Sequence, residues 1–327
     1  LFRSNILTNS ISEKGFIEIN GWKSGFFIKG ENINNPVLLY LHGGMPDYFL
    51  TQDFPTGLDE IFTVVWWDQR GAGLSFNAQL DRNTVSIDTL VEDTREITKY
   101  LSKRFSQDKI YLMAHSGGTF PGVKVIEKYP DLYHAYIGVA QISWQKLSEK
   151  KACDYITERY RNDKKKKKIY NDLINNPVIM TEPIPSEYTR IRDYAMHDLG
   201  IGTMHSMRNV ITGIFIPSLL FREYSISEKI NLWKGKAGSG ISIIWDEIIS
   251  HDLSRENTEF KVPVYFLHGK YDYTCSYELA REYFDKISAP AKGFYSFNNS
   301  AHSPIFEEPE ECVRIIKEDI LGRQAAF

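Results

Sequence analysis

Three short segments of the chain carry side chains that together can perform nucleophilic catalysis. The segment Ala114-His115-Ser116-Gly117-Gly118 matches the turn G-x-S-x-G, except that alanine replaces the first glycine. Asp272 and then His302 follow it along the chain. A serine hydroxyl is a weak nucleophile until a base accepts its proton, and that base needs a third group to fix its tautomer. This order of residue types predicts Ser116 as the nucleophile, His302 as the general base and Asp272 as the residue that orients the base.

A glycine pair upstream of the serine can help to stabilise the intermediate of such a reaction. The tetrahedral intermediate carries a negative oxygen, which preorganised backbone N–H groups stabilise. His42-Gly43-Gly44 follows a continuous apolar run at residues 37–41, so the glycines stand at the end of a predicted buried strand. Their position, one strand and helix before the serine turn, is the one that an oxyanion loop requires.

The elements that position these segments are strands and helices in alternation. Apolar runs predict strands at residues 37–41, 62–67, 109–114, 136–140, 264–269 and 294–297. Asn20-Gly21 predicts a hairpin turn between two further strands at 16–19 and 25–28. Apolar side chains at helical spacing predict helices at 84–101, from Ser116 to about residue 129, and near the C-terminus.

The alternation stops between residues 143 and 260, where the pattern is helical. We therefore predict an α/β fold with a mostly parallel central sheet flanked by helices and an inserted helical cap. The predicted parts are a core at 1–142, the cap at 143–260 and the rest of the core at 261–327. A run of lysines at 164–168 is typical of a solvated helix face.

Composition narrows the function further. The chain has 327 residues and a formal net charge of −3, which argues against a nucleic-acid partner. No apolar run is long enough to cross a membrane, and no cluster has metal-ligand or cofactor-binding spacing. The three cysteines predict free thiols in a reducing compartment, hence a cytoplasmic location. The chain starts at Leu1 without a signal peptide, which leaves open whether a leader was removed. The expected partner is a small-molecule substrate, and a monomer or a homo-oligomer fits equally.

One longer motif gives a family resemblance. Trp67-Asp68-Gln69-Arg70-Gly71-Ala72-Gly73-Leu74-Ser75 closely resembles the W-D-Q-R-G-x-G-x-S segment of the proline iminopeptidase branch of the α/β-hydrolases. Leu41-His42-Gly43-Gly44 resembles the start of that branch's H-G-G-P-G loop. The resemblance covers residues 15–142 and 260–320, and it implies the α/β-hydrolase fold and the same triad. It also implies that the backbone N–H groups of Gly44 and Gly117 form the oxyanion hole.

The chain departs from the family pattern at three places. Met45-Pro46 follows the glycine pair, and Gly117 stands where a bulky residue often follows the nucleophile. Aminopeptidases of this branch hold the free amine of the substrate with cap glutamates, and no local pattern singles out Glu187, Glu223 or Glu247 for that role.

Three functions are weighed from these observations. We favour slightly an esterase or lactonase that uses an acyl-enzyme intermediate on a bulky, largely apolar molecule such as a macrolide-type lactone. An apolar stretch of the cap motivates this prediction, because apolar linings suit such ligands. The predicted substrate-binding residues are Met45, Met204, Met207 and Phe215. The alternative is an aminopeptidase of proline iminopeptidase type. The least favoured hypothesis is a non-catalytic ligand-binding protein on a hydrolase scaffold.

Overall fold

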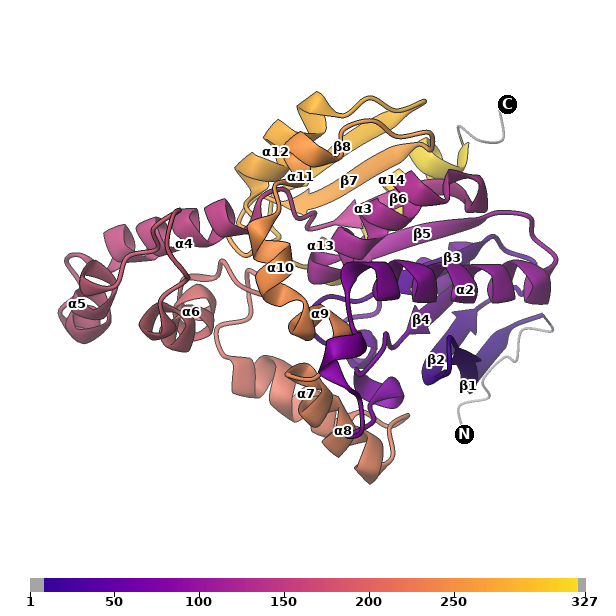
Figure 1. The fold of residues 1–327 in the computed structure, drawn as a ribbon, viewed down its shortest axis with the longest axis horizontal. Coiled ribbons are helices and arrows are strands. Elements are labelled where there is room, and N and C mark those ends of the chain that lie inside the picture. The colour runs from indigo at the N-terminus through magenta and orange to yellow at the C-terminus, as the bar shows by residue number, and fades with distance from the viewer. Residues whose placement is uncertain (1–8, 323–327) are drawn as a thin grey trace.

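The computed structural model describes residues 9–322 and contains one sheet of eight strands (Figure 1). The strands are β1 Ile11–Ile19, β2 Trp22–Gly30, β3 Val37–Leu41, β4 Thr63–Trp67, β5 Ile110–His115, β6 Tyr133–Val139, β7 Val264–Gly269 and β8 Lys292–Phe297. Their order in the sheet is β1-β2-β4-β3-β5-β6-β7-β8. The strands from β4 to β8 pair in parallel, whereas β1 and β2 pair antiparallel at one edge.

The predicted hairpin is present at that edge. Ile19 pairs with Trp22, and the two residues between them, Asn20 and Gly21, have φ values of 48° and 73°. Positive φ at both positions is the backbone of a tight hairpin turn, which asparagine and glycine adopt readily. The predicted strands at 37–41 and 264–269 have the observed bounds, and the others differ at their ends.

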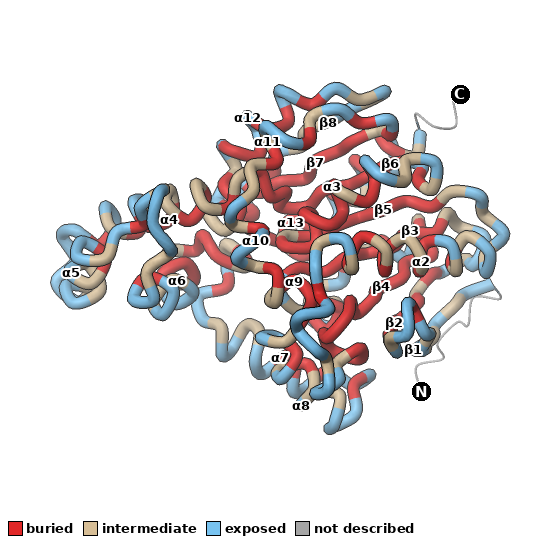
Figure 2. Tube along the Cα trace, in the orientation of Figure 1, coloured by how far each residue is buried: buried red, intermediate tan, exposed pale blue. Residues whose placement is uncertain are grey.

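Both faces of the inner parallel strands β3, β4, β5 and β7 are buried, as their continuous apolar sequences predict, whereas the edge strand β8 is largely exposed or half-buried (Figure 2). In β3, Leu39 packs with the core on one face and Leu38 with the core on the other. Helices cover both faces of the sheet. They are α1 Leu58–Ile61, α2 Ile87–Phe105, α3 Thr119–Lys128, α12 Tyr277–Lys286, α13 Pro304–Glu307 and α14 Pro309–Ile315. The helix predicted at 84–101 begins at Ile87 because the Ser86 side chain caps it.

The segment between β6 and β7 contains only helices and turns. Its helices are α4 Gln145–Tyr160, α5 Lys167–Asn175, α6 Ser186–Leu199, α7 Ile216–Leu220, α8 Ile226–Lys236, α9 Gly240–Ile243, α10 Trp245–Ser250 and α11 Leu253–Glu256. Helices α4 to α6 share a small hydrophobic cluster of their own and project to one side of the sheet (Figure 1). In contrast, Ile241, Ile248 and Leu253 belong to the main core. The last part of the insertion is therefore packed as core, although it lies inside the predicted cap at 143–260.

Candidate active site

The predicted nucleophile stands on a sharp turn at the carboxyl end of β5. Ser116 has φ of 53°, a conformation that costs energy for a residue with a side chain and is often found at functional sites. The turn also packs tightly against β3, since a Cβ atom on Gly118 would lie 2.4 Å from the carbonyl oxygen of His42. Small residues are thus required around Ser116 for a steric reason, which is what the sequence pattern indicated.

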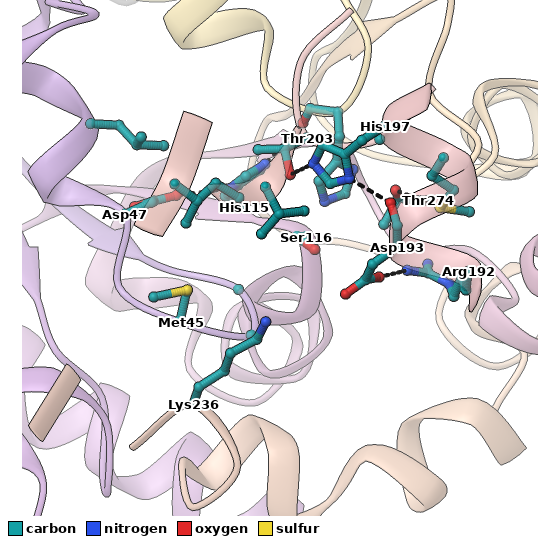
Figure 3. Close-up of a pocket in the computed structure, with 18 of the residues that line it drawn as sticks. Met45, Asp47, His115, Ser116, Arg192, Asp193, His197, Thr203, Lys236 and Thr274 are labelled. Carbon is teal, nitrogen blue, oxygen red and sulfur yellow. Dashed lines mark hydrogen bonds and ion pairs between the residues drawn. The ribbon is translucent and has the colours of Figure 1, made fainter. Parts of the chain in front are cut away.

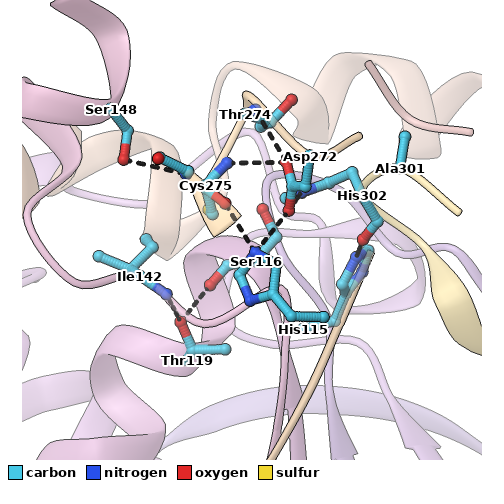
Figure 4. A network of polar contacts seen from close by, with 12 residues as sticks. His115, Ser116, Thr119, Ile142, Ser148, Asp272, Thr274, Cys275, Ala301 and His302 are labelled. Carbon is cyan, nitrogen blue, oxygen red and sulfur yellow. Dashed lines mark hydrogen bonds and ion pairs between the residues drawn. The ribbon is translucent and has the colours of Figure 1, made fainter. Parts of the chain in front are cut away.

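The predicted base and its orienting carboxylate are in contact. His302 Nδ1 donates a hydrogen bond to Asp272 Oδ2 over 2.9 Å (Figure 4). Asp272 Oδ1 accepts from the backbone N–H groups of Thr274 and Cys275 over 2.8 and 3.0 Å, and His268 Nε2 lies 3.1 Å from Oδ2. Burial disfavours the charged carboxylate, but these partners outweigh it and hold the pKa of Asp272 well below its usual range. Asp272 is therefore an anion that fixes the tautomer of His302.

The electrostatics of His302 suit a base. Burial lowers the pKa of His302 from its ordinary value, and the Asp272 anion offsets this only in part. His302 is therefore neutral at pH 7 and can accept a proton through Nε2. His302 and Ser116 line the same cavity. Within residues 9–322 no hydrogen bond joins His302 to the Ser116 hydroxyl, and such bonds often form fully only when a substrate is bound.

A second histidine and carboxylate lie beside the triad. His115 Nδ1 lies 3.0 Å from Asp47 Oδ2, and His115 Nε2 donates to the backbone carbonyl of His302 over 2.9 Å. Tyr40 donates to the same oxygen of Asp47 over 2.7 Å. Burial opposes a charge on His115, but the Asp47 anion outweighs it and raises the pKa of His115. Asp47 was not predicted from the sequence, because it stands in no recognised motif and His115 lies 68 residues further along the chain.

The glycine pair reaches the nucleophile as an oxyanion loop must. A Cβ atom on Gly43 would lie 2.8 Å from Cβ of Ser116, whereas a Cβ on Gly44 would meet nothing within 4 Å. Gly44 therefore borders open space next to the serine. The role of Gly44 and Gly117 as donors stays a prediction. Gly117, which replaces a bulky residue of the family pattern, leaves room for Ile241, whose Cγ2 would lie 2.7 Å from an added Cβ.

The segment Trp67–Ser75 holds the oxyanion loop in place. The backbone N–H of Gln69 donates to His42 Nε2 over 3.0 Å, and the Gln69 amide donates to the His42 carbonyl over 2.7 Å. Arg70 forms a buried ion pair with Asp93, with Nε 2.6 Å from Oδ2. The Arg70 carbonyl in turn accepts from the N–H of Gly240, at the start of α9, over 2.8 Å. The Trp67–Ser75 motif, which has the strongest family resemblance, thus connects the oxyanion loop to the insertion through hydrogen bonds.

Ser116 lines two neighbouring cavities, and the smaller of them is drawn in Figure 3. One has a volume of about 200 Å³ and the other of about 460 Å³. Both are lined by Gly44, Ser116, Arg192, Asp193, Lys236 and Thr274. The smaller cavity has an apolar wall, made of Met45, Phe49, Leu50, Met196, Val210 and Ile214. The larger cavity is lined further by Glu149, Ile184, Tyr188, Thr189, Ile241, Ser242 and Trp245.

The predicted substrate-binding residues divide into two groups. Met45 lines the smaller cavity, as expected. Met204 and Met207 instead pack in the core, and Phe215 packs against Trp233 with ring centroids 5.1 Å apart. These three residues are not among those that line the two cavities, which corrects the expectation. Their apolar character serves packing, and periodicity in one sequence does not distinguish packing from a pocket wall.

The charged residues of the cavities were not expected from the sequence. Glu149 is buried and satisfied, because Arg192 donates to both of its oxygens over 2.6 and 2.9 Å and Tyr188 donates to one over 2.8 Å. Asp193 accepts from Arg192 through one oxygen over 3.0 Å, and its side chain is 60% exposed. Glu187, Glu223 and Glu247 are not among the residues that line the two cavities. Asp47 also lines the smaller cavity, but its side chain is only 11% exposed and is held by Tyr40 and His115. Asp193 is therefore the more accessible carboxylate of the cavities.

No helix among the described residues is long and apolar enough to cross a membrane. All three cysteines are buried free thiols.

Comparisons with known proteins agree with this fold. Residues 34–177 match the serine aminopeptidase S33 family. The chain is 30% identical over 296 residues to "Probable aminopeptidase YbaC" of Bacillus subtilis, which covers 90% of this chain and 91% of that protein. It is 24% identical to a proline iminopeptidase of Saccharolobus solfataricus over 94% of this chain and 91% of that one. The fold resembles that of the Mycobacterium smegmatis proline iminopeptidase, with a TM-score of 0.67, 12% identity, and coverage of 96% of this chain and 99% of that one.

The fold defines an α/β-hydrolase. The chain belongs to the proline iminopeptidase-like branch of that family, as its motifs indicated, and it is a hydrolase.

Proposed function

We propose that the protein is a serine aminopeptidase that releases the N-terminal residue of a peptide, with Ser116 as its nucleophile. The observation that carries the proposal is Asp193, a carboxylate with one unoccupied oxygen in the cavities that Ser116 lines. A carboxylate oxygen of this kind can accept a charge-assisted hydrogen bond from the cationic amine of a peptide, and such bonds are stronger than those between neutral groups. The aminopeptidase names of the relatives support this substrate class over the ester that the sequence alone slightly favoured.

Acylation would begin with attack of Ser116 Oγ on the carbonyl carbon of the first peptide bond. The hydroxyl proton passes to His302 Nε2 as the C–O bond forms, and Asp272 stabilises the resulting imidazolium. The backbone at Gly44 and Gly117 would stabilise the negative oxygen. When the intermediate collapses, the C–N bond breaks and His302 returns its proton to the leaving amine.

Deacylation would repeat these steps with water. His302, neutral again, accepts a proton from water as its oxygen attacks the acyl carbon. The bond to Ser116 then breaks, Oγ takes the proton back from His302, and the free amino acid leaves.

One observation favours a second candidate, hydrolysis of an ester or lactone. The wall of the smaller cavity, with Met45, Phe49 and Leu50, suits an apolar acyl or alcohol group. The same triad chemistry cleaves esters, so the substrate class depends on whether Asp193 has an amine to bind.

A paired substrate panel tests the proposal. The panel contains Pro-linked and Ala-linked aminoacyl amides, their N-acetylated forms, p-nitrophenyl esters and lactones including macrolides. We expect hydrolysis of the free-amine amides and a loss of about tenfold in kcat/KM on N-acetylation, because Asp193 is partly exposed and a charge-assisted hydrogen bond to it contributes about 1.5 kcal/mol. Asp193→Asn should produce the same loss on free-amine amides and leave acetate esters unchanged.

Two controls complete this experiment. Ser116→Ala should lower kcat on the order of 10⁶-fold, as removal of a serine nucleophile does in a serine protease. Glu187→Gln, an exposed carboxylate on the same helix as Asp193, should leave all rates unchanged. Efficient hydrolysis of esters or lactones with no turnover of free-amine amides would refute the aminopeptidase and favour the second candidate.

A further inference from the structure

A lysine with no carboxylate partner lies in the cavities beside the nucleophile. Lys236, the last residue of α8, lines both cavities together with Ser116 and Asp193. Figure 3 shows its side chain directed into the space that Asp193 also enters. Lys236 makes no ion pair in the described part of the chain, and its aromatic neighbour is Trp233, with the ring centroid 5.7 Å from Nζ.

The backbone of Lys236 is held firmly against the core. A Cβ atom on the preceding Gly235 would lie 2.9 Å from the carbonyl oxygen of Gly71, so glycine allows α8 to touch the Trp67–Ser75 segment. The Lys236 carbonyl also accepts a hydrogen bond from Ser242 Oγ over 2.6 Å. The side chain therefore starts from a fixed point at the rim of the cavities, which limits the entropy lost when its ammonium binds a ligand.

The charged side chains of the cavities differ in whether they have an ion-pair partner. Arg192 donates to Glu149 and to Asp193, so its charge is compensated. Asp193 has an oxygen left for a cation, and Lys236 has all three donors left for an anion. Burial disfavours the charge of Asp193, but Arg192 and then Lys236 outweigh it and lower the pKa of Asp193, so Lys236 and Asp193 are within electrostatic reach of each other. A ligand with an ammonium and a carboxylate satisfies both.

We propose that Lys236 binds the C-terminal carboxylate of a short peptide whose amine is held by Asp193. This inference rests on the proposed aminopeptidase function and narrows its substrate to free di- and tripeptides. One residue extends a chain by at most about 3.5 Å, so the two ends of a tripeptide are no more than about 10 Å apart and both can lie in the cavities that share Asp193 and Lys236. Lys236 is then a specificity residue, and it takes no part in the bond-breaking steps.

A comparison of acid and amide substrates tests the role of the charge. Hydrolysis of Pro-Ala and of Pro-Ala amide is measured for the wild type, Lys236→Met and Lys234→Met at low ionic strength. Methionine keeps the length and flexibility of lysine without its charge, and Lys234 is an exposed residue of the same helix that does not line the cavities. We expect the wild type to prefer the free acid by on the order of tenfold in kcat/KM, the size of a charge-assisted hydrogen bond. Lys236→Met should abolish the preference by slowing only the acid, and Lys234→Met should retain it.

Several outcomes would overturn the inference. They are equal kcat/KM for acid and amide in the wild type, an equal loss on both substrates in Lys236→Met, and loss of the preference in Lys234→Met. The preference should also shrink in 1 M salt, which screens exposed charges.

Binding separates this inference from the proposed function. The dissociation constants of Pro-Ala and its amide for the Ser116→Ala variant, measured by calorimetry, report the carboxylate preference without turnover. If peptides are not hydrolysed but the acid still binds on the order of tenfold tighter, the aminopeptidase fails and the carboxylate site stands. Equal dissociation constants would refute the carboxylate site whether or not the wild type hydrolyses peptides.

Discussion

Three of the buried histidines near Ser116 differ in pKa, because their burial and hydrogen-bond partners differ. Burial lowers the pKa of His42 to about 4, and its ring accepts from the Gln69 N–H, which suits a neutral imidazole. Asp47 raises the pKa of His115, which donates to the His302 carbonyl. His302 lies between these cases, with a carboxylate partner but a lowered pKa. The predicted base His302 is thus more easily kept neutral, whereas the neighbouring His115 is more easily protonated.

The lowered pKa of His302 predicts the acidic limit of activity. As the pH falls through this pKa, the imidazole gains a proton and can no longer accept that of Ser116. Because burial lowers the pKa below 6.5, kcat/KM should be retained to a lower pH than for an ordinary histidine. We expect a single acidic limb with its midpoint below pH 6.5. It is measured with p-nitrophenyl acetate, which has no amine to titrate.

The His115→Gln variant provides a control for this profile. The charge on His115 contributes to lowering the pKa of His302, so its removal should move the midpoint toward higher pH. A wild-type midpoint above pH 7, or a rate that stays flat from pH 4 to 8, would contradict a buried histidine base at this position.

The Trp67–Ser75 segment holds three separate parts of the fold together. It contacts the oxyanion loop through Gln69, helix α2 through Arg70 and Asp93, and the start of α9 through the Arg70 carbonyl. The Arg70 guanidinium also lies over the Trp22 ring, 5.3 Å from its centroid. The Arg70–Asp93 ion pair is the most deeply buried charged contact of the segment, because the two side chains are only 8% and 2% exposed.

Removal of one partner of this pair should destabilise the fold strongly. Arg70→Met leaves Asp93 buried without its cation, which costs about 3–5 kcal/mol in the free energy of unfolding. Arg95→Met, which removes an ion pair with Glu92 on the same helix as Asp93 but at the surface, should cost no more than ~1 kcal/mol. Urea denaturation of both variants measures the difference. Similar losses of unfolding free energy in the two variants would show that the buried Arg70–Asp93 pair stabilises the fold no more than a surface ion pair does.

Most of the strands and turns could be predicted from the sequence, whereas several cavity residues could not. Local patterns predicted the strands, the hairpin and the serine turn, because alternation, apolar runs and tight turns are properties of adjacent residues. The contact between His302 and Asp272 followed from motif order. Asp193 and Lys236 were missed, since neither stands in a motif. They come together only in the fold, where α6 and α8 each contribute one of them to the cavities that Ser116 lines. Met204, Met207 and Phe215 do not line the two cavities for another reason, because periodicity in one sequence does not distinguish a packing residue from a cavity wall.

At the scale of the whole molecule, the insertion and the sheet together enclose the site. The sheet contributes Ser116 and His302 from its carboxyl edge, and the insertion contributes the cavity walls from α6, α8 and α10 (Figure 1). Helix α9 is tied to the core by its contact with Arg70, and the last part of the insertion packs within the main core. The walls on that side are therefore as firmly fixed as the triad, and they limit the size of what can reach it.

This enclosure predicts that turnover falls as peptides become longer. A chain longer than a few residues must displace insertion side chains or leave through the larger cavity of about 460 Å³, past Trp245. A steric cost of about 1.4 kcal/mol already gives a tenfold loss, so peptides of ten residues should have kcat/KM at least ~10-fold below that of tripeptides with the same first residue. Liquid chromatography of the released amino acid measures the series at 2, 3, 5 and 10 residues. Trp245→Ala widens the larger cavity and should recover part of the loss for the longest peptide while it leaves tripeptides unaffected. If the wild type cleaves all four lengths equally well, the insertion does not select substrates by size.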